Sequence, residues 1–239
     1  MDPGAPVIVR GVDDDRVIEV DGIRLAYRVW GSPEAEPLVL LHSLGDRGAD
    51  WGEVAPAFAR HRRVYAPDLR GHGRSDWPGD YSVELAQADV LGFLDALQLD
   101  RVDLIGHSLG GLVAYLLAGD HPERVSRLIL EDVAALRPRE RGAPDRPDGE
   151  LPYDWEMILA IRRQIDDPDP AWLRRLGQIT AETLVIGGGT PSYIPQEWVA
   201  ELAGQIPGAK LDTIPVGHMI HKADPEAFSR VALGFLSLA

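Results

Sequence analysis

A glycine-flanked serine is the feature of this sequence that most strongly suggests chemistry. Ser108 lies in the segment Gly106-His107-Ser108-Leu109-Gly110, between an apolar strand predicted over 101–105 and an apolar helix predicted over 112–117. A sharp strand-to-helix turn strains the backbone at the serine, and the flanking glycines let strand and helix approach closely. The helix N-terminus supplies backbone N–H groups and the positive end of a dipole. The pattern predicts an activated nucleophile with part of an oxyanion hole, and a plain glycine-rich turn with a serine N-cap is the simpler alternative.

The amino-acid composition limits the kinds of molecule that this protein is expected to bind. The chain has 239 residues, of which 45% are hydrophobic and 26% charged, as expected of a globular protein with a substantial core. The net charge of −14 argues against a nucleic-acid partner, and the absence of cysteine excludes disulfides and thiolate metal sites. No apolar run is long enough to span a membrane, and the N-terminus lacks the apolar core of a secretory signal. We therefore expect a cytoplasmic enzyme, monomeric or weakly homo-oligomeric, that acts on a small molecule.

The elements that must position Ser108 alternate along the chain. A hairpin is predicted around Asp21-Gly22, and the later strands are short apolar runs typical of strands buried on both faces. Strands are predicted over 16–20, 23–30, 38–41, 63–66, 101–105, 125–130, 184–186 and 210–214. Helices are predicted over 51–60, 83–97, 112–118, 155–165, 171–176, 198–205 and 225–236, and residues 1–15 as a loose arm. This order predicts the α/β class, with a mostly parallel central sheet and helices on both of its faces.

One segment is too long for a simple crossover between two core strands. Residues 133–178 contain a Pro-, Arg-, Asp- and Gly-rich loop over 137–150 and two short amphipathic helices. An excursion from the carboxyl edge of such a sheet lies where these folds bind ligands. We predict a core domain of residues 1–132 and 179–239 and a small helical cap of residues 133–178; a solvated insertion is the alternative. The cap residues Tyr153, Trp155 and Ile158 are candidates to line a pocket.

Four motifs together resemble the α/β-hydrolase family, over the chain from about residue 16 to the end. They are the elbow at Ser108, the segment His42-Ser43-Leu44-Gly45 after a buried strand, the loop from Asp68 to Asp76, and Gly217-His218 after the last strand. The resemblance implies a catalytic His218 and an oxyanion hole made by the backbone N–H groups of Leu44 and Leu109. His218 also follows a strand and a glycine turn that lead to the same sheet edge as Ser108, where it would act as general base and then acid. His221 is a weaker alternative base.

The sequence departs from the family at two positions. Ser43 stands where glycine is usual, so it either holds a more ordinary backbone conformation or adds a hydroxyl near the oxyanion. The usual place for the triad acid, after the strand that follows the cap, holds Gly188 to Ser192 and no carboxylate before Glu197. Asp132 ends the preceding strand, where some family members carry the acid, and is our preferred candidate. Glu131, a cap residue such as Asp154, or no acid at all remain alternatives.

These residues predict a serine hydrolase that cleaves a small or medium carboxylic ester, lactone or thioester through an acyl-enzyme. The catalytic residues would be Ser108, Asp132 and His218, with no cofactor and no metal ion. A C–C bond hydrolase or a cofactor-free perhydrolase could use the same constellation. A slow-turnover ligand-binding protein of the same fold is a further alternative, because fold alone does not fix activity. Dehalogenase chemistry is not expected, because it needs an aspartate where Ser108 stands.

Overall fold

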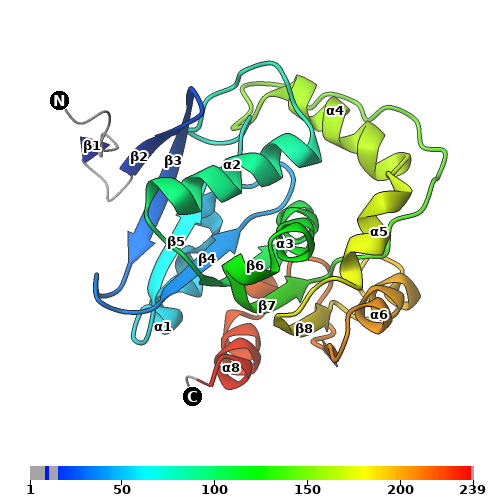
Figure 1. The fold of residues 1–239 in the computed structure, drawn as a ribbon. Coiled ribbons are helices and arrows are strands. Elements are labelled where there is room, and N and C mark those ends of the chain that lie inside the picture. Colours follow the sequence, from blue (N-terminus) through cyan, green and yellow to red (C-terminus); the bar gives the residue numbers. More distant parts are fainter. Residues whose placement is uncertain (1–8, 11–15, 238–239) are drawn as a thin grey trace.

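The central element of the protein is a twisted sheet of nine strands (Figure 1). The computed structural model describes residues 9–10 and 16–237. The spatial order of the strands is β1-β2-β3-β5-β4-β6-β7-β8-β9, with antiparallel pairing from β1 to β5 and parallel pairing from there on. The strands are β1 (Val9–Arg10), β2 (Arg16–Val20), β3 (Ile23–Trp30), β4 (Pro37–Leu41), β5 (Arg63–Pro67), β6 (Val102–His107), β7 (Val125–Glu131), β8 (Glu182–Gly187) and β9 (Lys210–Thr213). The prediction of a mostly parallel sheet is confirmed.

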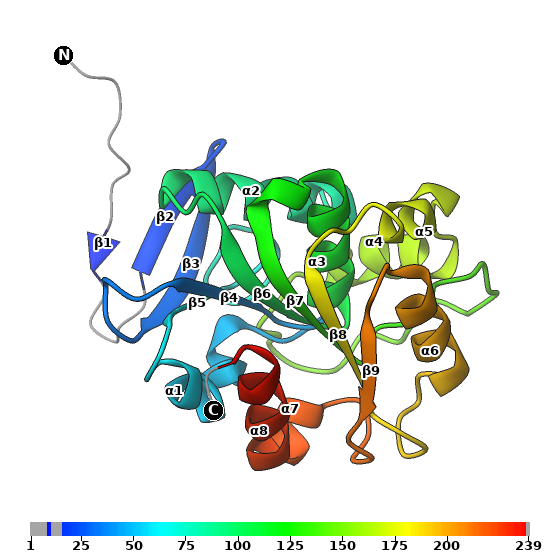
Figure 2. The ribbon, with the colours of Figure 1, turned by 60° about the horizontal axis from the view of Figure 1, so that its bottom comes forward.

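Helices cover both faces of this sheet, as predicted. Figure 2 shows α2 and α3 on one side of the sheet and α1 and α8 on the other. The helices are α1 (Ala55–Phe58), α2 (Val83–Ala96), α3 (Leu109–Asp120), α4 (Trp155–Asp166), α5 (Pro170–Leu176), α6 (Gln196–Gln205), α7 (Ile220–Ala223) and α8 (Pro225–Phe235). Two 3₁₀-helices, η1 (Gly48–Glu53) and η2 (Pro122–Arg124), connect them to neighbouring strands.

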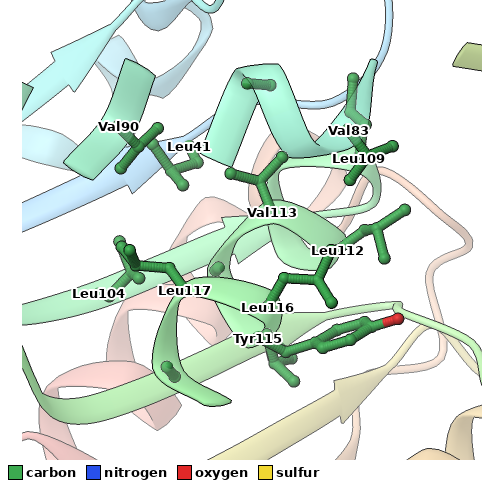
Figure 3. Packing of buried hydrophobic residues seen from close by; sticks show 14 of the residues in the cluster. Leu41, Val83, Val90, Leu104, Leu109, Leu112, Val113, Tyr115, Leu116 and Leu117 are labelled. Carbon is green, nitrogen blue, oxygen red and sulfur yellow. The ribbon is translucent and has the colours of Figure 1, made fainter. Parts of the chain in front are cut away.

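The alternation of side chains along the buried strands creates two separate apolar layers. On β4, Leu38 and Leu40 belong to the layer under α1 and α8, while Val39 and Leu41 belong to the layer under α2 and α3. Successive residues of a strand point to opposite faces, so a strand covered on both sides is apolar throughout. α3 lies at the centre of the second layer and is buried on nearly all of its surface, as the packing around Leu112, Val113 and Leu116 shows (Figure 3).

Parallel pairing brings the ends of the central strands to one edge of the sheet. Ile105 on β6 lies opposite Ile129 on β7, which in turn lies opposite Leu184 on β8. The residues that follow these strands, including Ser108 and Asp132, therefore emerge side by side. Ligands of open α/β sheets bind at this edge.

Two local expectations differ from the structure or fall outside it. The helix predicted over 51–60 is instead η1 followed by the short α1, because Pro56 lacks the N–H that a longer helix would need and occupies the first turn of α1. Most of the loose arm predicted for residues 1–15 lies outside the described residues, apart from β1. Within the described part of the chain, no helix is long and apolar enough to cross a membrane.

The segment 133–178 contains one irregular stretch and two helices. The stretch from β7 to α4 has no helix or strand longer than an isolated bridge, in agreement with the predicted loop. α5 packs against α3 and α6, and its Trp172 and Leu176 belong to the main apolar layer. The assignment of the whole segment as a separate cap stays a prediction.

Candidate active site

Ser108 occupies the turn between β6 and α3 in a strained backbone conformation. Its φ of 51° and ψ of −113° lie in a region that residues with a side chain rarely adopt. A Cβ at Gly106 would lie 2.4 Å from the Gly110 carbonyl oxygen, and a Cβ at Gly110 would lie 2.3 Å from that of Leu41. Both positions therefore require glycine. The turn leaves Ser108 half-buried and lining a cavity at the carboxyl edge of the sheet.

His218 and Asp132 form a buried pair at the same cavity. His218 Nδ1 lies 2.8 Å from Asp132 Oδ2, and both residues line the cavity with Ser108. Asp132 directly follows β7, and His218 lies in the loop after β9, directly after Gly217 at a φ of 95°. A carboxylate at Nδ1 holds the ring as the tautomer with its proton on that nitrogen, which leaves Nε2 as an acceptor.

The segment that replaces the usual acid supplies hydrogen bonds to Asp132 instead. The Gly188 N–H donates to Oδ1 at 2.8 Å, the Gln196 amide donates to Oδ1 at 3.0 Å, and the Ser192 hydroxyl donates to Oδ2 at 2.5 Å. Burial raises the pKa of Asp132, but the hydrogen bonds from His218, Ser192, Gln196 and Gly188 outweigh it, so the pKa is lowered overall. Asp132 is therefore ionised at neutral pH, and hydrogen bonds to both of its carboxylate oxygens fix its orientation.

The alternative acid and the alternative base pair with each other, away from this site. Glu131 precedes Asp132 on the chain, and its carboxylate lies 2.9 Å from His221 Nδ1 and accepts from the His221 backbone N–H at 2.9 Å. The indole of Trp51 stacks on the His221 ring with centroids 4.0 Å apart. Glu131 and His221 are both buried, and neither lines the cavity that holds Ser108.

His107 connects this second pair to the loop that carries His218. Its Nε2 lies 2.9 Å from the His218 carbonyl oxygen, so the neutral ring donates there. Burial, with smaller contributions from His218 and His221, lowers the pKa of His107 to about 4, against the opposing charge of Glu131. Ligand atoms of His107, Glu131 and His221 lie within 4.8 Å of one another, which is a spacing that a metal ion can use. Because the Glu131 oxygens already accept three contacts from His221, we interpret the cluster as a hydrogen-bonded support for the His218 loop.

Glu131→Gln should destabilise the fold far more than it affects catalysis. Removing one partner of a buried pair leaves the other uncompensated and costs about 3 kcal/mol in free energy of unfolding. Burial raises the pKa of Glu131, but His107 and His221 outweigh it and hold the pKa below the ordinary value of a glutamate. A depressed pKa contributes stability above the unfolded-state value, which is lost as pH falls through the folded-state value. Urea unfolding should therefore show a lower free energy of unfolding for the variant than for wild type at pH 7, and this difference should narrow only as the pH falls below the ordinary glutamate pKa of about 4.3.

Glu182→Gln is the matched control for this experiment. The Glu182 side chain is 76% exposed and lies 3.7 Å from Arg127, so its loss should cost less than about 1 kcal/mol. Equal effects of the two substitutions at pH 7 would contradict the buried pair as a stabilising element.

The loop from His42 to Gly45, which contains the predicted oxyanion residue Leu44, is fixed by two buried histidines. His42 Nε2 accepts from the Leu69 N–H at 2.9 Å, and His72 Nε2 accepts from the Gly45 N–H at 3.1 Å. Burial lowers the pKa of both rings, that of His72 to about 3, so both are neutral and can accept. Leu44 and Leu109, the first residue of α3, line the cavity beside Ser108.

The Ser43 hydroxyl has a partner other than the expected oxyanion. Its Oγ donates to Asp46 Oδ2 at 2.7 Å, and Asp46 Oδ1 accepts from Lys222 Nζ at 2.9 Å. Burial raises the pKa of Asp46, but the hydrogen bonds from Lys222 and Ser43 outweigh burial and lower the pKa overall. This carboxylate therefore stays charged and paired. Ser43 lines the cavity, and its side chain connects the loop from His42 to Gly45 to α7 through Asp46 and Lys222.

The cavity has a volume of about 330 Å³, at the small end of the range for ligand sites. Its lining includes Ser43 but none of the predicted cap residues Tyr153, Trp155 and Ile158. Ile158 is buried in the main apolar layer, against which Trp155 and Tyr153 pack. A contact of these three side chains with substrate stays a prediction, since an apolar side chain on an amphipathic helix, such as Ile158, also fits the core. The residues that line the cavity from the later half of the chain, and that the sequence did not single out, are Val133, Ala134, Leu136, Arg139, Arg141, Arg162, Ile165, Tyr193, Ile194, Pro195, Trp198 and Met219.

A family model described as the alpha/beta hydrolase fold matches residues 36–163, more than half of the chain. The chain belongs to this family. Its likeness to a solved structure, the enol-lactonase from Burkholderia xenovorans LB400, covers 92% of this chain and 99% of that one, at 28% identity and a TM-score of 0.83. The protein is thus a member of the alpha/beta hydrolase fold family.

Sequence relatives in the family carry several hydrolase names. A 2-hydroxy-6-oxo-2,4-heptadienoate hydrolase of Pseudomonas putida is 46% identical over 120 residues, which are 48% of this chain and 43% of that protein. A putative carbamate hydrolase RutD of Variovorax paradoxus is 30% identical over 256 residues, covering 89% of this chain and 96% of that protein. The chain spans between 32% and 43% of the length of the first curated relatives it matches. These names differ in substrate, so the family alone does not fix the reaction.

Proposed function

We propose that this protein is a serine hydrolase that cleaves a compact carboxylic ester, lactone or thioester through an acyl-enzyme on Ser108. The observation that carries the proposal is the 2.8 Å contact between His218 Nδ1 and Asp132 Oδ2, at the cavity into which the Ser108 turn opens. A nucleophile on a strained turn, a histidine and an orienting carboxylate are the parts that acyl transfer requires.

The proposed reaction proceeds in two steps. In the first, His218 Nε2 accepts the Ser108 proton while Oγ attacks the carbonyl carbon, and the backbone N–H groups of Leu44 and Leu109 stabilise the oxyanion. Asp132 stabilises the imidazolium that forms, and His218 then donates its proton to the leaving alcohol or thiol. In the second step, His218 accepts a proton from a water molecule, which attacks the acyl carbon. The bond between that carbon and Ser108 Oγ then breaks, His218 returns the proton to Oγ, and the acid leaves.

A second candidate function is cleavage of a carbon–carbon bond by the same residues. It is favoured by the identity of 46% over 120 residues to the heptadienoate hydrolase of Pseudomonas putida. That match covers only 48% of this chain, whereas the likeness to the enol-lactonase covers 92%. We therefore rank ester and lactone cleavage first.

Stopped-flow kinetics with p-nitrophenyl butyrate tests the proposal. An acyl-enzyme that forms faster than it hydrolyses releases a burst of p-nitrophenolate equal to the enzyme concentration. Because the cavity is only about 330 Å³, kcat/KM for the butyrate should exceed that for the palmitate by roughly tenfold or more. Turnover of carbon–carbon substrates without any ester turnover would favour the second function. Absence of turnover for every substrate class would favour a ligand-binding protein.

A further inference from the structure

One wall of the candidate active-site cavity is positively charged, although the protein as a whole is strongly acidic. Arg139 and Arg141 from the loop after β7, and Arg162 from α4, all line the cavity that holds Ser108. The net charge of the chain is −14, so a chance surface position is more often acidic than basic. We call these three residues the arginine wall.

The arginine wall is only partly neutralised by its surroundings. Asp166 at the end of α4 accepts from Arg139 Nε at 2.7 Å and lies 3.9 Å from Arg162 Nε, which is too long for a hydrogen bond. Arg162 Nε is buried and has no hydrogen-bond partner among the described residues. Within residues 9–10 and 16–237, no carboxylate forms an ion pair with Arg141. Among the described residues, Asp166 is therefore the one carboxylate near Arg139 and Arg162, Arg141 has none, and the buried Nε of Arg162 lacks a hydrogen-bond acceptor.

The two carboxylates that line the cavity already have hydrogen-bond or ion-pair partners. Asp46 is held by Lys222 at 2.9 Å and by Ser43, and Asp132 by His218 at 2.8 Å. The remaining lining is apolar or neutral, apart from His218 itself. An anionic group in this cavity would meet free positive charge on the arginine wall and little repulsion.

The arginine wall also lies close to the catalytic histidine. The ring of Tyr193 is tilted against that of His218 with centroids 4.5 Å apart. Desolvation and the charge of Asp132 raise the pKa of Tyr193, and the guanidinium groups of Arg162 and Arg141 act in the opposite direction. The electric field of these arginines thus reaches Tyr193, a side chain in contact with His218. A substrate that reaches from His218 to the arginine wall must be compact, because the cavity holds only about 330 Å³.

We propose that the arginine wall binds a carboxylate of the substrate, so that the enzyme selects esters, lactones or thioesters that carry a second, free acid group. The planar guanidinium fork matches a carboxylate in a bidentate arrangement, and Arg162 Nε would gain the acceptor it lacks. The inference rests on the proposed function, because it assigns the non-reacting end of the same substrate. Hydrolysis of such a half-ester consumes one water and yields a dicarboxylate and an alcohol.

Two p-nitrophenyl esters that differ in one charge test this inference. They are the p-nitrophenyl half-ester of adipic acid, with a free carboxylate, and the same compound with that carboxylate methylated. The measured quantity is the ratio of kcat/KM for the charged ester to kcat/KM for the methylated ester, taken from nitrophenolate release after subtraction of the uncatalysed rate. Wild type should give a ratio above roughly 10, the scale of one hydrogen bond to a charged group.

Three arginine variants localise the effect. Arg162→Gln should lower the ratio by roughly tenfold, toward one, and Arg141→Gln, in an exposed loop where folding is not at risk, should lower it by a smaller factor. Arg163→Gln is the matched control, because Arg163 is exposed on the same helix and does not line the cavity. It should leave the ratio unchanged.

The outcomes separate this inference from the function on which it rests. The carboxylate site would be overturned by a wild-type ratio near one, or by a fall of the ratio in Arg163→Gln as large as that in Arg162→Gln. The proposed function would still stand in that case if both esters were hydrolysed through Ser108. Failure of the enzyme to hydrolyse either ester through Ser108 would overturn the proposed function itself.

Discussion

Ser108→Ala is expected to lower kcat for p-nitrophenyl butyrate by about 10⁶-fold, the scale seen when the nucleophile of a serine hydrolase is removed. The loss is large because no other group can form the acyl-enzyme, and His218 and the oxyanion N–H groups then act on water alone. The fold should survive, since alanine can occupy the same turn and the glycines at 106 and 110 that permit it are unchanged.

Initial rates and circular dichroism on both proteins provide this measurement. Ser229→Ala, a serine-to-alanine change on α8 and outside the cavity lining, is the matched control and should retain the wild-type rate. Activity of Ser108→Ala within tenfold of wild type would show that another residue attacks the substrate.

Asp132→Asn is expected to lower kcat by about 10³- to 10⁴-fold, the scale seen when the histidine is held in the wrong tautomer. An asparagine amide facing His218 Nδ1 can donate to it, which would move the ring proton to Nε2 and block its role as base. The side chain keeps nearly the same shape, so the contacts with Gly188 and Gln196 change little in geometry.

The effect of Asp132→Asn must be separated from a general loss of negative charge. Asp212→Asn, on the exposed strand β9, makes the same change of charge and should leave kcat within about twofold, as expected of a surface substitution. Glu131→Gln should cost far less kcat than Asp132→Asn, because its carboxylate contacts His221 and not His218. If Asp132→Asn stays within tenfold of wild type while its fold is intact, the acid must be sought elsewhere.

The sequence was sufficient to predict the strands of the sheet and the residues that lie at its carboxyl edge. Ser108 and Asp132 follow β6 and β7, which are largely buried, and His218 lies in the loop after the exposed strand β9. The parallel pairing of β6, β7, β8 and β9 brings the ends of these strands together. The pairing of Asp132 with His218 followed from the lack of a carboxylate between Gly188 and Glu197. Such inferences work because strand ends and turns are encoded locally.

The lining of the cavity could not be predicted in the same way. Apolar periodicity on α4 shows which residues avoid water, but not whether core or substrate covers them, and Ile158 is covered by the core. The position of Arg139 depends on its contact with Asp166, which is distant in sequence and joins a loop to the end of a helix. The 3₁₀-helix η1 was also missed, although Pro56 was a local signal for it.

The most direct test of a serine acyl-transfer mechanism is the mass of the intact protein after reaction with a fluorophosphonate, followed by peptide mapping. We expect one adduct per chain, on the peptide that contains Ser108, and no adduct on Ser108→Ala. An adduct on any other residue, or an equal adduct on the alanine variant, would contradict it.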